Sequence, residues 1–173
     1  MEPSRRSLIF RIAPALGVAA GSLAIPSIAS ADDPGLDEQG IHEGIDYIES
    51  IPDSALVSQE AFDSWKQENP VVSPRGAVGC GIAITTAFVS NALVVSKVLK
   101  IKAAIKAAGG AKKFADLLIT GFKVAKAEGK SNSAAIKFAA QEAAAIGGSE
   151  ALTAILEVLS VAGVAEKCFG VDL

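Results

Sequence analysis

Glycines divide the C-terminal half of this 173-residue chain into stretches of helical length. Breaks at Gly109-Gly110, Gly129 and Gly147-Gly148 separate stretches in which apolar residues recur every three or four positions. That spacing places apolar side chains on one face of an α-helix, and glycine commonly follows a helix end. We therefore predict an all-α fold, with a compact bundle of about four short helices in residues 77–173.

The four helices have expected limits. The first begins in the uncharged residues 77–96 and continues to Ala108, because Val94, Val98, Ile101 and Ile105 form one stripe. The others are expected at about residues 111–128, 133–146 and 150–167, the last with Ser149 as its N-cap. Short turns between them favour an up-down antiparallel topology. By length and apolarity alone, residues 77–96 would also qualify as a membrane-crossing helix.

Charge is sorted along the chain, although its total is only −3. Residues 32–76, the acidic segment, hold eleven acids against Lys66 and Arg75, a net charge of −9. Residues 77–173, the lysine-rich region, hold eleven lysines against seven acids, a net charge of +4. Such separation is expected when one segment neutralises or masks another.

Residues 1–31 are typical of an export signal. A charged start at Ser4-Arg5-Arg6 precedes an apolar stretch and the small residues Ala29-Ser30-Ala31. We predict secretion, with signal peptidase cutting between Ala31 and Asp32. The twin-arginine and general secretory routes both remain open, and the alternative to cleavage is a retained membrane anchor.

Cys80 and Cys168 are the only cysteines, and neither belongs to a metal-binding or redox motif. In an oxidising compartment we expect a disulfide between them, closing a loop of about 89 residues that contributes about 4–5 kcal/mol. Two buried free thiols are the alternative.

The acidic segment contains two expected amphipathic helices and a linker. Ile41, Ile45 and Ile48 recur at helical spacing, and residues 58–67 bring Phe62 and Trp65 to one side of a second helix. Two prolines and a glycine then interrupt residues 68–76. The bond between Arg75 and Gly76 is a candidate site for a processing protease, or the arginine is incidental to a plain linker.

The lysines of the lysine-rich region suggest an anionic partner. A lysine near an anionic lipid surface contributes about 1 kcal/mol, whereas one at the bilayer centre costs about 2.5–3.5 kcal/mol. We therefore expect the lysine-bearing helices to lie at the interface of a bacterial membrane, where the protein could also self-associate, while residues 77–96 and the fourth helix enter more deeply. The candidate docking residues are Lys97, Lys100, Lys102, Lys106, Lys112, Lys113, Lys123 and Lys126.

The residues required for catalysis are not grouped in this sequence. The single histidine, His42, lies in the acidic segment, and the acids of the lysine-rich region have neither metal-ligand spacing nor a phosphate-binding glycine loop. The lysine-rich region also has no Arg, Tyr or Trp to read or stack on bases. We predict no enzyme activity, no cofactor or metal, and no nucleic-acid partner.

This organisation resembles the precursors of secreted helical bacteriocins. The resemblance rests on the signal at residues 1–31, the acidic leader ending near Arg75-Gly76 and the Lys/Ala/Gly-rich helical region from about Ala77. The region is also similar to saposin-type bundles and to circular bacteriocins of that shape, although it has two cysteines where saposins have six. The resemblance implies membrane activity without an enzyme active site.

Three functions are compatible with these features. The first is an antimicrobial precursor that permeabilises bacterial membranes, kept inactive when the acidic segment pairs its charges with the lysine-rich region and covers its apolar surface. The alternative is a secreted, soluble helical bundle that binds a protein or an apolar ligand and keeps residues 32–76 permanently. The third is a membrane-anchored subunit.

Overall fold

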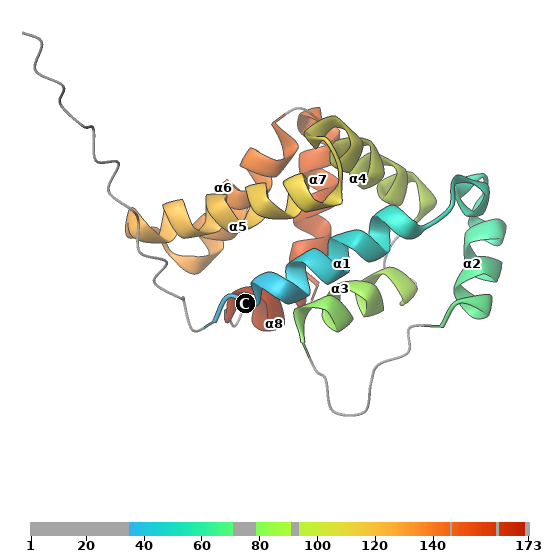
Figure 1. Cartoon of the computed structure of the whole chain (residues 1–173), viewed down its shortest axis with the longest axis horizontal. Helices are drawn as coiled ribbons and strands as arrows, with labels where there is room; N and C mark the ends of the chain where they lie inside the picture. The colour runs from blue at the N-terminus through green and yellow to red at the C-terminus, as the bar shows by residue number, and fades with distance from the viewer. Residues whose placement is uncertain (1–34, 71–78, 91–93, 146, 162, 172–173) are drawn as a thin grey trace, which may run out of the picture. The chain divides into compact units, whose positions relative to one another are not determined.

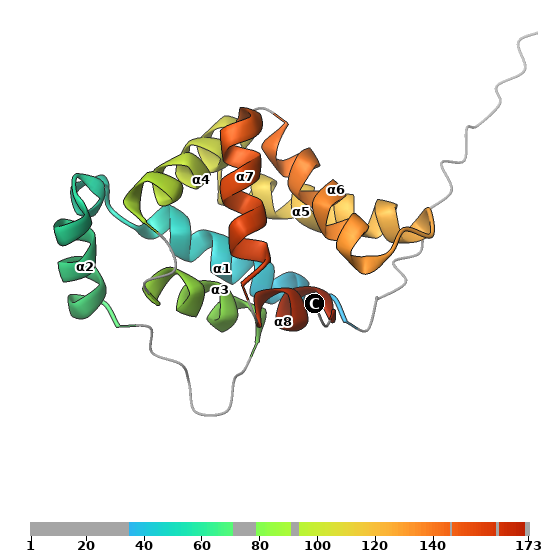
Figure 2. The same ribbon diagram turned by 180° about the vertical axis from the view of Figure 1, so that it is seen from behind.

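Helices form the regular structure in every described part of the chain (Figures 1 and 2). The computed structural model describes residues 35–70, 79–90, 94–145, 147–161 and 163–171, all within the unit Asp32–Leu173. Over these residues the fold is all-α, without strands, which confirms the predicted class. The predicted signal peptide, including Ala31 and Asp32, lies outside the described residues, and so do Arg75 and Gly76.

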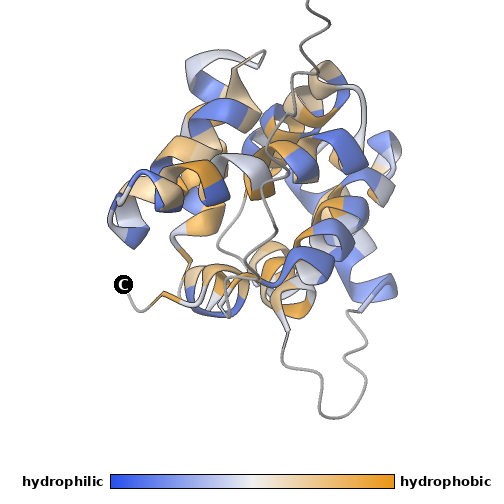
Figure 3. Cartoon of the chain, turned by 60° about the vertical axis from the view of Figure 1, so that its left-hand side comes forward, coloured by the Kyte–Doolittle hydropathy of each residue, from blue (hydrophilic) through white to orange (hydrophobic). Residues whose placement is uncertain are grey.

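Three helical elements lie in the acidic segment and six in the described part of the lysine-rich region. The first three are α1 (Glu38–Ser50), the 3₁₀ turn η1 (Asp53–Leu56) and α2 (Gln59–Glu68). The remaining six are α3 (Cys80–Val89), α4 (Val95–Ala108), α5 (Ala111–Ala127), α6 (Asn132–Ala144), α7 (Gly148–Leu159) and α8 (Val164–Phe169). Hydropathy varies within each helix, as expected where one face is buried (Figure 3).

Helix α1 packs against helices of the lysine-rich region along its whole length. It lies beside α3 and α5 and also contacts α4 and α8 (Figures 1 and 2). Helices α5 and α6 pack on each other most extensively, and α7 contacts both α4 and α6. The isoleucines predicted to form the apolar face of α1 are buried in the shared core: Ile41, Ile45 and Ile48 are 1%, 5% and 1% exposed.

The prediction of four helices in the lysine-rich region is wrong, because two of them are divided. Helix α3 ends where Ser90 turns extended, and α4 begins after an extended Val94. The Ser90 hydroxyl donates to the carbonyl of Ala87, a local bond that competes with helix continuation. Gly163, at φ 94°, separates α7 from α8. Glycine tolerates that left-handed conformation, so the chain changes direction there.

The remaining helix limits lie close to those predicted. Helix α5 begins after Gly110 and α6 after Ser131, whose hydroxyl accepts from the Ala134 amide. Ser58 caps α2 in the same way. Ser149 does not cap α7, which begins at Gly148, two residues before the predicted start, with Gly147 at its N-cap position.

Glycines allow α1 and α3 to approach closely. A Cβ atom on Gly44 would lie only 2.5 Å from Cδ1 and 2.8 Å from Cβ of Ile84, and one on Gly40 would lie 2.7 Å from Cβ of Cys80. Any larger residue would therefore separate the helices or displace a branched side chain. The close packing fixes the position of the first turn of α1 beside the cysteine that begins α3.

The predicted disulfide between Cys80 and Cys168 is confirmed, with an S–S distance of 2.03 Å. It joins the start of α3 to α8, and both cysteines are fully buried. Among the described residues, no helix combines the length and the apolarity needed to cross a bilayer.

Candidate functional site: the contact between the acidic segment and the lysine-rich region

The acidic segment supplies capping groups to three helices of the lysine-rich region. The N-cap residues of α3, α4 and α5 are Gly79, Val94 and Gly110, and none makes a side-chain cap hydrogen bond. The first amides of these helices donate instead to side chains far away in sequence. The three bonds are Cys80 N to Asp37 Oδ2 (3.0 Å), Val95 N to Gln59 Oε1 (3.1 Å) and Ala111 N to Glu49 Oε2 (3.2 Å).

These bonds have a clear electrostatic basis. The first amides of a helix have no acceptor within the helix, and the helix dipole places partial positive charge there. Asp37 and Glu49 therefore each bring a carboxylate to a favourable position. Glu49 sits in the last turn of its own helix α1, where a negative charge is unfavourable. The carboxylate of Glu49 is therefore stabilised by the first amide of α5 and not by its own helix α1.

Asp37 links both ends of the disulfide to the acidic segment. Its Oδ1 accepts from the Gly40 amide at 2.8 Å and caps α1, while its Oδ2 accepts from Cys80. Its own amide donates to the Cys168 carbonyl at 3.0 Å. One residue thus fixes the starts of α1 and α3 and contacts α8.

Two ion pairs and one histidine–carboxylate contact also cross this interface. The ion pairs are Lys123 with Glu38 (2.5 Å) and Lys102 with Asp53 (3.0 Å), and His42 Nε2 lies 3.2 Å from Asp116 Oδ1. Lys102 also donates to the carbonyl of Ile51. Because the carboxylates of these pairs are 41–92% exposed, each contributes no more than about 1 kcal/mol. Burial of α1 and the helix caps are therefore the larger contributions to the attachment.

The predicted docking lysines fall into two groups. Five of them contact a side-chain partner: Lys97 (Glu157), Lys100 (Glu150), Lys102 (Asp53), Lys123 (Glu38) and Lys126 (Asn132). The other three, Lys106, Lys112 and Lys113, are exposed around the turn between α4 and α5. Three of the eight predicted lysines are thus exposed around the turn between α4 and α5, and the other five have side-chain partners. Their role at a membrane stays a prediction.

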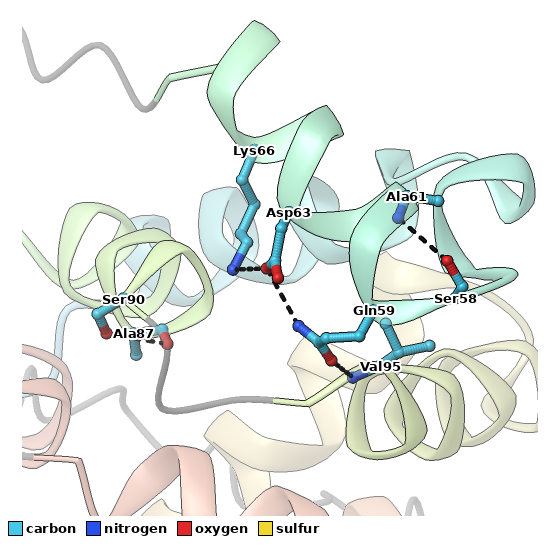
Figure 4. A network of polar contacts seen from close by, with 8 residues as sticks. All are labelled: Ser58, Gln59, Ala61, Asp63, Lys66, Ala87, Ser90 and Val95. Atoms are coloured by element: carbon cyan, nitrogen blue, oxygen red, sulfur yellow. Dashed lines mark hydrogen bonds and ion pairs between the residues drawn. The ribbon is translucent and has the colours of Figure 1, made fainter.

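Helix α2 is anchored by a small polar network, shown in Figure 4. Gln59, whose carbonyl oxygen caps α4, donates through its amide nitrogen to Asp63 at 3.1 Å. Lys66 lies 2.6 Å from Asp63 and 4.9 Å from the Phe62 ring centroid, with its side chain only 6% exposed. The hydrogen bond from Lys66 lowers the pKa of Asp63, which keeps the carboxylate ionised.

The only tyrosine of the chain, in α1, packs against the only tryptophan, in α2. The rings of Tyr47 and Trp65 are 6.0 Å apart, and Trp65 stacks on Phe62 at 6.2 Å. Burial raises the pKa of Tyr47, and within the described structure its hydroxyl has no hydrogen-bond partner. This cluster holds α2 to the end of α1.

An apolar cavity in the described core has little space for a small molecule. It lies where α1, α3, α4, α5, α7 and α8 meet, and its volume of about 20 Å³ is room for about one water molecule. Among the described residues, no group of three or more His, Cys, Asp or Glu side chains could hold a metal ion.

Sequence patterns did not identify Asp37, Glu49 and Gln59. A signal was nevertheless present, since α3 and α5 begin directly after glycines, which leaves their first amides in need of an acceptor. The sequence alone could not indicate which distant side chain supplies it. Comparison with protein-family models, with curated proteins and with solved structures finds no match for this chain.

Proposed function

We propose that this protein is a secreted antimicrobial precursor that permeabilises bacterial membranes, and that its acidic segment holds the lysine-rich region in a closed, inactive form. The observation that carries the proposal is the position of α1. It places the buried Ile41, Ile45 and Ile48 against α3 and α5, while acidic-segment side chains complete three helix starts.

Loss of the acidic segment would change the lysine-rich region in three ways. The apolar faces of α3 and α5 that contact α1 would become accessible, the first turns of α3, α4 and α5 would lose their caps, and Lys102 and Lys123 would lose their carboxylate partners. Helices with an exposed apolar face and a lysine-bearing polar face bind anionic membrane interfaces. The exposed Lys106, Lys112 and Lys113 would provide the first attraction to such a surface.

Dye release from vesicles tests this proposal. The disulfide-bonded protein 32–173, with a specific protease site placed within residues 71–78, would be cut, and the two fragments separated in denaturant. We expect fragment 76–173 to empty vesicles rich in phosphatidylglycerol, and to act far less on phosphatidylcholine vesicles, because its lysines require an anionic surface. Uncut 32–173 should release much less dye. Equal release by both forms would remove the inhibitory role, and no release by 76–173 would remove the membrane activity.

The second candidate is a secreted bundle that binds a protein partner and keeps residues 32–76. The same burial of α1 favours it, because a segment that lies in the core can be a permanent part of the fold. The apolar cavity of about 20 Å³ in the described core is itself too small to hold an apolar small molecule. Mass spectrometry of the secreted product separates the two candidates: a single species beginning at Asp32 favours the binding protein, and a shorter species beginning near Gly76 favours the precursor.

A further inference from the structure

We infer that the described acidic residues 35–70 form a detachable inhibitor, which stays bound to the lysine-rich region as a separate chain after residues 71–78 are cut. Cutting alone would then leave an inactive two-chain complex. The inference rests on the proposed function for its biological meaning, but the binding itself can be measured without any membrane.

The covalent connections make such a complex feasible. The only two cysteines both lie in the lysine-rich region, where their disulfide joins α3 to α8. After a cut between residues 70 and 79, no covalent bond would hold the acidic segment. Its retention would then depend wholly on side-chain packing and hydrogen bonds.

Those contacts are distributed along the whole inhibitor. Asp37 caps α3 from the beginning of α1, Glu49 caps α5 from its end, and Gln59 caps α4 from the first turn of α2. Between them, Ile41, Ile45, Ile48 and Ile51 are at most 5% exposed. A segment attached at several points in this way cannot leave by releasing one end.

The lysine-rich region in turn presents a surface that fits this particular segment. Three helix starts without caps of their own face it, at positions that require an acceptor oxygen. The face of α3 that packs on α1 also requires glycine in its partner helix, since Ile84 leaves no room for a Cβ atom at Gly44. This surface therefore fits a helix that has acceptor side chains at both ends and glycines between them. Helix α1 has both features.

Gel filtration of the cut protein tests the inference directly. We expect fragments 32–75 and 76–173, with the disulfide intact, to elute together at the volume of uncut protein, to separate in denaturant, and to elute together again after dilution. Separate elution in buffer directly after cutting would overturn the inference.

A matched pair of variants tests the role of the caps. Glu49→Ala and Asp46→Ala each remove one carboxylate from the last two turns of α1, but only Glu49 reaches a helix of the lysine-rich region. We expect Glu49→Ala to increase the dissociation constant of the cut complex about fivefold, the typical effect of losing one N-cap, and Asp46→Ala to leave it unchanged. Equal weakening by both variants would show that net charge, not capping, holds the segment.

Inhibition by the free fragment completes the test. Fragment 32–75 added to fragment 76–173 should lower dye release from phosphatidylglycerol vesicles in proportion to the complex formed, and the fragment carrying Glu49→Ala should require about fivefold more peptide. If the fragments separate on cutting and 76–173 releases dye, the inhibitor inference fails and the proposed function stands. If they remain together and 76–173 never releases dye, the proposed function fails and the two-chain complex stands.

Discussion

Replacement of Asp37 should destabilise two helix starts at once, in an amount that depends on how many acceptor oxygens remain. In Asp37→Ala, the amides of Gly40 and Cys80 both lose their acceptor. Loss of an N-cap costs about 1 kcal/mol, so we expect the free energy of unfolding to fall by about 2 kcal/mol. In Asp37→Asn one oxygen remains and the amide group cannot accept from the second N–H, so we expect a loss of about 1 kcal/mol.

Urea unfolding of the oxidised protein, followed by circular dichroism, measures these differences. Both variants remove the same charge, so the difference of about 1 kcal/mol between them reports the one remaining cap. Asp46→Ala is the control, because it removes an exposed carboxylate of α1. The reasoning is refuted if Asn and Ala at position 37 cost the same, or if Asp37→Ala costs no more than the control.

Three further expectations concern packing, titration and the disulfide. Gly44→Ala should lower the free energy of unfolding by about 1–3 kcal/mol in urea, because the new methyl group overlaps Ile84. At an exposed helix position the same change raises the free energy of unfolding by about 1 kcal/mol. A gain in stability for Gly44→Ala would contradict the close approach of α1 and α3. Tyr47, the only tyrosine, should have a pKa above the ordinary tyrosine value of 10.0 in an absorbance titration at 295 nm, and unfolding should return the pKa to that value. Since the folded form has the higher pKa, the stability gained by keeping Tyr47 protonated is complete below pH 10.0 and is lost as the pH rises through the folded pKa. Equal titration midpoints for Tyr47 in the folded and unfolded chains would contradict its burial. The double variant Cys80→Ser and Cys168→Ser should lose about 4–5 kcal/mol, and a thiol reductant should destabilise the wild type but not the variant.

Local sequence signals predicted the elements whose ends are set locally. Helix α5 follows two glycines at φ 95° and 108°, and its apolar stripe continues without interruption, so its limits could be read directly. The disulfide followed from the number of cysteines and the expected compartment. The interruption between α3 and α4 was missed, because apolar periodicity continues across it and the signal for a break is weak.

Attachment of the acidic segment through its buried isoleucines was predicted, but its helix-capping bonds were not. The count of charges indicated attraction between the two parts, yet Lys97 and Lys100 pair with Glu157 and Glu150 of their own region. A net charge cannot show which partner a given lysine selects, because that depends on the packing of distant helices. The capping contacts of Asp37, Glu49 and Gln59 were beyond sequence reasoning for the same reason.

The capping contacts also add long-range pairings that must form during folding. The three cap bonds join residues that are 43, 36 and 62 positions apart, so the first turns of α3, α4 and α5 mature only after long loops have closed. Proteins rich in such distant pairings fold more slowly than helical proteins with local contacts. During synthesis the acidic segment emerges first, and Asp37, Gln59 and Glu49 wait for 43, 36 and 62 further residues before their partners are made, so the growing chain is most exposed to proteases in that interval.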